Sequence, residues 1–201
     1  MPTRSTTAWW LGSAFAAAAT LAAVTLAAFG TAEHGTVTAL RVTARFSFLL
    51  FFLAYAGGGL AALVGPALRP LRQHGREFGL AFAAAHLVHV LLIIWLCWIG
   101  AAPVAGVFRF FAPPLVCIYV LALFSVGRLQ QVLGRTVWRL LRTVAMTYIA
   151  YAFATDFLRD PLGHGVSHMI QYIPFAALSL AGPVLHFFAL LPLASRLRAS
   201  A

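Results

Sequence analysis

The chain is poor in charged residues and contains very few acidic ones. Its 201 residues include two aspartates, two glutamates and no lysine, and only 9% are charged, whereas a soluble domain averages about 25%. Four carboxylates provide no paired acids for hydrolytic chemistry and no carboxylate proton relay. The sequence also lacks a phosphate-binding glycine loop, a Ser-His-Asp set and the ligand spacing of a zinc site. These absences argue against common hydrolases, zinc proteins and ion-coupled transporters.

The composition is strongly apolar instead. Hydrophobic residues make up 62% of the chain, and the mean hydropathy is +0.92. The net charge of +10 comes entirely from arginine, and in a soluble protein such a charge would indicate nucleic-acid binding. Here the arginines lie between apolar runs, as the positive-inside rule describes for membrane proteins. We therefore expect membrane lipid, and no nucleic acid, among the partners.

Six apolar runs predict an all-α fold, a single-domain bundle of six transmembrane helices over residues 1–201. The runs cover residues 8–30, 46–66, 79–98, 113–127, 137–158 and 172–195, and a span needs about 20 residues. The fourth run is short because Pro113-Pro114 and Arg109 interrupt it, and we expect an interfacial turn at Phe108–Phe111. The first run exceeds the apolar region of about 7–15 residues in a signal peptide, so we expect it to be retained.

The distribution of arginine predicts the orientation in the membrane. Six spans place both termini on one side, and that side carries nine arginines against four on the other. The nine are Arg4, Arg69, Arg72, Arg76, Arg128, Arg135, Arg139, Arg196 and Arg198, and the four are Arg41, Arg45, Arg109 and Arg159. Cytoplasmic loops carry the excess of basic residues, so both termini are expected in the cytoplasm.

Two histidines, His86 and His89, lie in the middle of the third run. Because they are three residues apart, both point from one helix face. An ionisable group at membrane depth is costly and usually has a partner, and imidazole is an axial ligand of haem iron. The alternatives are therefore a haem ligand, a proton path or a histidine hydrogen-bonded to a neighbouring helix. His186, in the last run after Pro183, is a further candidate ligand, although it could instead satisfy a carbonyl freed by the proline.

Other residues could accommodate a cofactor. Arg142 lies about one turn inside the fifth run, where it could snorkel to the cytoplasmic surface or form a salt bridge to a haem propionate. Arg72, in a cytoplasmic loop, is a second candidate for a propionate. The glycines at 57–59 could allow close helix packing or make room for a flat macrocycle.

The chain has two cysteines, and both are expected near the outer face of the membrane. Cys97 lies near the end of the third run and Cys117 near the start of the fourth. They could form a disulfide on the oxidising side of the membrane. The alternative is two buried thiols that act as small apolar residues.

Three segments carry a family resemblance. Thr43-Ala-Arg45-Phe-Ser-Phe opens the second run, Leu71-Arg-Gln-His-Gly-Arg-Glu-Phe-Gly-Leu80 precedes His89, and Leu133-Gly leads to Trp138-Arg-Leu-Leu in the fifth run. Together they span roughly residues 43–158. In these motifs the chain resembles the ferric reductase-like transmembrane domain family, and within it the haem-binding membrane subunits of bacterial periplasmic methionine-sulfoxide reductase systems.

The resemblance implies a b-type haem protein that passes electrons in the bacterial inner membrane, with His89 at the position of a haem ligand on the third helix. The family's two other ligands lie on the fifth helix, and the matching positions here are Arg142 and Thr155. His86 or His186 would then complete the site.

The chain has no room for a nucleotide- or flavin-binding module, so a redox partner would be a separate molecule. One alternative is a haem-free structural or assembly subunit of a larger membrane complex. Another is a small-molecule or lipid transporter.

Overall fold

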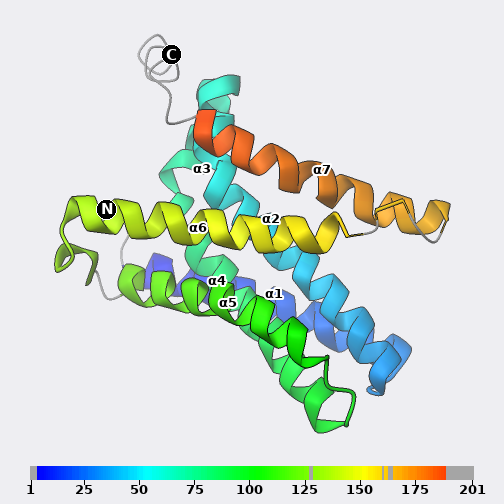
Figure 1. Cartoon of the computed structure of the whole chain (residues 1–201). Coiled ribbons are helices and arrows are strands. Elements are labelled where there is room, and N and C mark those ends of the chain that lie inside the picture. Colours follow the sequence, from blue (N-terminus) through cyan, green and yellow to red (C-terminus); the bar gives the residue numbers. More distant parts are fainter. Residues whose placement is uncertain (1–3, 127–128, 160, 163–164, 189–201) are drawn as a thin grey trace. The chain divides into compact units, whose positions relative to one another are not determined.

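Every regular element in the described part of the chain is a helix (Figure 1). The structure, a computed structural model, describes residues 4–126, 129–159, 161–162 and 165–188. The α-helices are α1 (Arg4–Phe29), α2 (Glu33–Val64), α3 (Arg69–Gln73), α4 (Gly75–Trp98), α5 (Ala105–Val126), α6 (Arg135–Phe157) and α7 (Val166–Phe188). Two short 3-10 helices, η1 (Pro66–Leu68) and η2 (Leu129–Gln131), lie in the connections. The all-α prediction is therefore confirmed for these residues.

Five helices are long and apolar enough to cross a bilayer. They are Thr6–Phe29 of α1, α2, α4, α5 and His168–Phe188 of α7, with mean hydropathies of 1.3 to 2.3 over their most apolar windows. Helix α6 forms where the fifth run predicted it, but it does not belong to this set. It carries Arg135, Arg139 and Arg142 in its first turns and Asp156 near its end, and these charges lower its hydropathy.

The second helix begins earlier than the sequence predicted. An expected start at residue 46 becomes Glu33, because the helix continues through Arg41 and Arg45. Arginine is a good helix former, so two arginines do not end a helix even where they end an apolar run. The turn before it is made by Gly30, whose φ of 84° and N–H bond to the Leu26 carbonyl (2.8 Å) close α1 in the left-handed conformation that glycine favours.

The predicted interruption of the fourth run is wrong. Helix α5 begins at Ala105 and passes through Phe108–Phe111 and Pro113-Pro114 without a break. A proline removes one backbone donor, and helices of membrane type tolerate this loss more readily than the sequence prediction assumed. The last predicted run, 172–195, corresponds to α7, and its residues 189–195 lie outside the described residues.

The chain divides into two compact units, each of which is described by itself. The first comprises Met1–Phe51 and Glu77–Pro113, and the second comprises Phe52–Arg76 and Pro114–Ala201. The core of the first unit is rich in alanine, which lets helix backbones approach closely. Its buried members come from α1, α2 and α4 and are Ala14, Ala18, Ala22, Ala39, Ala81, Ala85, Val88 and Leu92.

In the second unit, α6 packs beside α7 (Figure 1). The Phe157 and Phe175 rings of these helices are 5.4 Å apart. Glycines of α2 permit other close contacts there. A Cβ on Gly59 would overlap the backbone carbonyl of Leu185 in α7, and one on Gly57 would lie 3.3 Å from the Leu71 Cβ. Close packing, one of the two alternatives for this glycine run, is therefore confirmed at Gly59 and Gly57.

Gly59→Ala should destabilise the protein, because the new methyl group would force the α2 and α7 backbones apart. We expect a loss of roughly 1–3 kcal/mol, as for other overpacked cores, measured as a lower unfolding temperature in detergent. Gly58→Ala is the matched control, since a Cβ there meets nothing within 4 Å and alanine favours a helix more than glycine does. An unfolding temperature unchanged by Gly59→Ala would contradict the close approach of these helices.

Candidate functional sites

His89 of α4, for which the sequence resemblance predicts a ligand role, is held by α2. In the first unit, the His89 Nδ1 lies 3.2 Å from the Thr43 Oγ1. The Thr43 hydroxyl has one hydrogen, which it donates to the Ala39 carbonyl (2.9 Å). With its hydrogen placed there, the Thr43 oxygen is left to accept from the imidazole nitrogen. This hydrogen-bond arrangement corresponds to the neutral tautomer with the proton on Nδ1 and a lone pair on Nε2.

The second histidine of α4 stacks on the first. The His86 and His89 ring centroids are 5.0 Å apart and the rings are inclined by 21°, so the prediction that both share one helix face is confirmed. The Phe82 ring lies 5.5 Å from His86 on its other side. His86 is thus held in a row of rings along α4, stacked on His89 and inclined by 45° to Phe82.

Polar and aromatic contacts align α2 with α4 in antiparallel register. Thr43 meets His89, and two turns later the Phe51 ring lies 5.3 Å from that of Phe82. Ser47 lies one turn from each end of this stretch of α2, so it is placed at the level of His86. Its side chain is fully buried, and its Oγ has no hydrogen-bond partner among the described residues.

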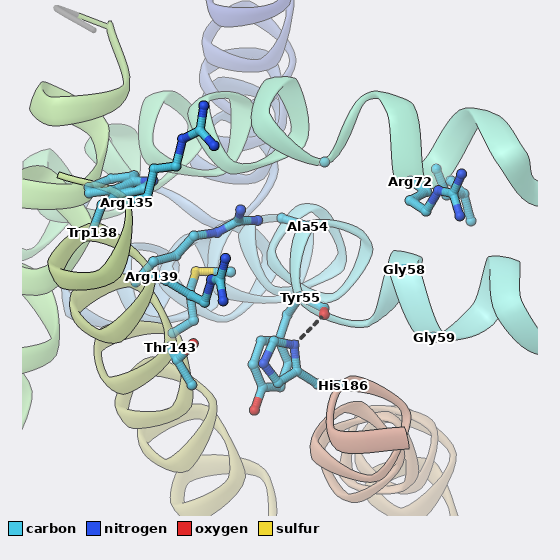
Figure 2. Close-up of a pocket in the computed structure, with 14 residues that line it drawn as sticks. Ala54, Tyr55, Gly58, Gly59, Arg72, Arg135, Trp138, Arg139, Thr143 and His186 are labelled. Carbon is cyan, nitrogen blue, oxygen red and sulfur yellow. Dashed lines mark hydrogen bonds between the residues drawn. The ribbon is translucent and has the colours of Figure 1, made fainter. Parts of the chain in front are cut away.

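An arginine-lined cavity lies in the second unit (Figure 2). Its volume is about 560 Å³, in the range of about 300–1,000 Å³ that small-molecule sites occupy. Arg72 of α3 and Arg135, Arg139 and Arg142 of α6 line it, and all four side chains are exposed. No aspartate or glutamate is among the described residues that line it. The cavity therefore offers many N–H donors and no carboxylate to neutralise them.

His186 of α7 lines the same cavity and is fixed in one orientation. Its Nδ1 lies 3.0 Å from the backbone carbonyl of Tyr55, drawn as the dashed line in Figure 2, and its ring stacks on the Tyr55 ring at 4.2 Å. A carbonyl only accepts, so the proton is again on Nδ1. Nε2 is buried and has no hydrogen-bond partner among the described residues. Histidines that bind metal commonly show this arrangement, in which the second nitrogen is tied to an oxygen.

The structure brings together some of the residues that the sequence singled out. His186, Arg142 and Arg72 line one cavity, and His86 and His89 stack on each other. Sequence reasoning missed Arg135 and Arg139 as site residues because it counted them only as flanking charges. Their spacing could have identified them, because positions 135, 139 and 142 recur at the helical period and share one face of α6.

The remaining predicted residues lie apart from these clusters. The Thr155 hydroxyl donates to the Ala152 carbonyl (2.8 Å). Cys97 and Cys117 are thiols that belong to different units, and the disulfide between them stays a prediction.

Comparison with known proteins gives no match: no protein-family model, no curated protein and no solved structure is significantly similar to this chain.

Thr43→Val should destabilise the first unit, because the buried Nδ1–H of His89 loses the hydroxyl oxygen that accepts it. A lost partner in a buried pair costs about 1–3 kcal/mol, measurable by thermal unfolding. Ser47→Ala is the matched control on the same helix face, and it should be neutral or stabilising because the Ser47 hydroxyl has no partner among the described residues. Equal losses in both variants would contradict the assignment of the hydrogen bond.

Proposed function

We propose that this chain is a multi-pass protein of the bacterial inner membrane with six spans and cytoplasmic termini. Five helices meet the length and apolarity of a span, and α6 would be the sixth. Its 23 residues extend about 35 Å, against about 30 Å for the bilayer core. Its three arginines all fall in its first turns, as expected at a cytoplasmic end.

We further propose that the protein binds haem b and passes electrons in the membrane. The observation that carries this proposal is the orientation of His89, whose Nδ1–H is held by α2 so that Nε2 is available to iron. An apolar helix and a hydrogen-bonded second nitrogen are what an axial ligand requires. When bound, the haem iron would supply one-electron chemistry, while this chain would hold the group and exclude water from it.

The rest of the ligand set departs from the family. Arg142 and Thr155 cannot replace imidazole on iron, so any further ligand would have to be another histidine. His186 of the second unit is one candidate, because it has the same arrangement by itself: its Nδ1 is tied to a carbonyl, and its Nε2 is buried and unpartnered within the described residues. His86 is the other candidate. Arg72 and Arg142, which line one cavity with His186, are the residues proposed for the propionates.

A second candidate function is that of a haem-free structural or assembly subunit of a larger membrane complex. Arg142 favours it, because a cation occupies the position of a haem ligand and faces a cavity rather than iron. This alternative predicts a colourless, folded protein that co-purifies with a partner.

His89→Ala should abolish haem binding, since it removes the proposed ligand. The measurement is an absorption spectrum of the detergent-purified protein, oxidised and then reduced with dithionite, together with a pyridine haemochrome assay. Wild-type protein should show a Soret band that shifts on reduction and near-stoichiometric haem. His34→Ala, at an exposed position, is the control and should retain haem.

Two results would refute the haem proposal. A featureless spectrum from folded wild-type protein would favour the haem-free subunit, and a full haem complement in His89→Ala would exclude His89 as the essential ligand.

A further inference from the structure

We propose that the arginine-lined cavity of the second unit binds the headgroup of an anionic phospholipid that carries a free hydroxyl, as in phosphatidylglycerol. This inference rests on the proposed membrane location, but not on the proposed haem. It follows from the charge of the cavity, its place on α6 and the buried acceptor that His186 supplies.

The charge of the cavity is unbalanced. Arg135, Arg139 and Arg142 share one face of α6, and Arg72 of α3 completes the group. Since no described carboxylate lines the cavity, the four guanidinium groups repel one another unless an anion lies among them. Guanidinium binds phosphate through paired N–H donors, and such charge-assisted bonds are about twice as strong as neutral ones.

The position on α6 selects a phosphate at the membrane surface. The cavity lies along the first turns of α6, the end assigned to the cytoplasmic face, where anionic lipid headgroups gather. Helix α6 begins after Gly134 with no side-chain cap, so its first N–H groups and its dipole also favour a negative charge. Basic pockets between membrane helices on the cytoplasmic side are a known setting for anionic lipid headgroups.

His186 adds a requirement for a hydroxyl. With its proton on Nδ1 and bonded to the Tyr55 carbonyl, its buried Nε2 can only accept. Every arginine in the cavity can only donate hydrogen bonds, so none of them can accept one from a hydroxyl of the ligand. His186 can. A phosphodiester that carries a glycerol hydroxyl would satisfy both, with its phosphate on the arginines and its hydroxyl on His186.

The walls of the cavity explain why a lipid is favoured over a free phosphate. Tyr55, Leu71 and Met146 line it together with the glycines of α2, which gives an apolar surface beside the arginines. A soluble anion would leave that surface exposed to water, whereas a glycerol backbone and the start of an acyl chain would cover it.

The test is native mass spectrometry of the delipidated full chain in neutral detergent, titrated with defined lipids. Phosphatidylglycerol should bind at least about tenfold more tightly than phosphatidylcholine, because its negative charge should add one or more charge-assisted contacts with the arginines. Phosphatidylmethanol, which has the charge but no hydroxyl, should fall between them.

The variants separate the two features of the site. Arg135→Gln with Arg139→Gln should weaken phosphatidylglycerol binding by about tenfold or more, while Arg41→Gln with Arg109→Gln, exposed arginines of the first unit, should not. His186→Phe, which keeps the stacking on Tyr55, should lower phosphatidylglycerol to the affinity of phosphatidylmethanol.

Several outcomes would overturn the proposal. These are equal binding of phosphatidylglycerol and phosphatidylcholine, equal losses in the two arginine pairs, or inorganic phosphate that binds as tightly as the lipid. Displacement of phosphatidylglycerol by added haem, with a Soret band that depends on His186, would assign the cavity to haem and leave the proposed function standing. A colourless protein that binds phosphatidylglycerol would refute the haem proposal and support this one.

Discussion

The four carboxylates of this chain cannot neutralise its fourteen arginines, and the positions of the unneutralised arginines are the main constraint on the structure. In a mostly apolar protein, each unpaired guanidinium must reach water, a lipid phosphate or a ligand. The excess gathers between the apolar runs and at the start of α6, and the proposed orientation rests on this distribution. In the second unit, it also lines a cavity with four arginines and no described acid.

The histidines have a different requirement, which is a hydrogen-bond acceptor for the ring N–H. A neutral imidazole in apolar surroundings needs an oxygen for its N–H, and the helices supply one in each unit: the Thr43 hydroxyl for His89 and the Tyr55 carbonyl for His186. Both contacts leave Nε2 as the acceptor. A haem ligand and an acceptor for a ligand hydroxyl require the same tautomer. The two proposals therefore differ in what approaches Nε2 and not in the state of the ring.

Much of the fold could be predicted from local patterns. Apolar runs of span length identified the long helices, and the spacing of His86 and His89 correctly placed them on one face. The errors came from residues whose effect on a helix boundary could not be predicted from the local sequence pattern. Arg41 and Arg45 ended an apolar run without ending a helix, and Pro113-Pro114 did not break α5.

By itself, the sequence determined the helical class, the apolar character and the scarcity of acids, because helix formation and hydropathy depend on residues within a few turns of one another. Only the tertiary structure decided which polar groups meet. The Tyr55 carbonyl and His186 are 131 positions apart, and Thr43 and His89 are 46 apart; no periodicity relates them. The same holds for the cavity, since the pattern of α6 puts three arginines on one face but cannot show that Arg72 and His186 line the same space. Such pairings depend on how helices pack, which follows from backbone approach at residues such as Gly59 and not from the residues that carry the chemistry.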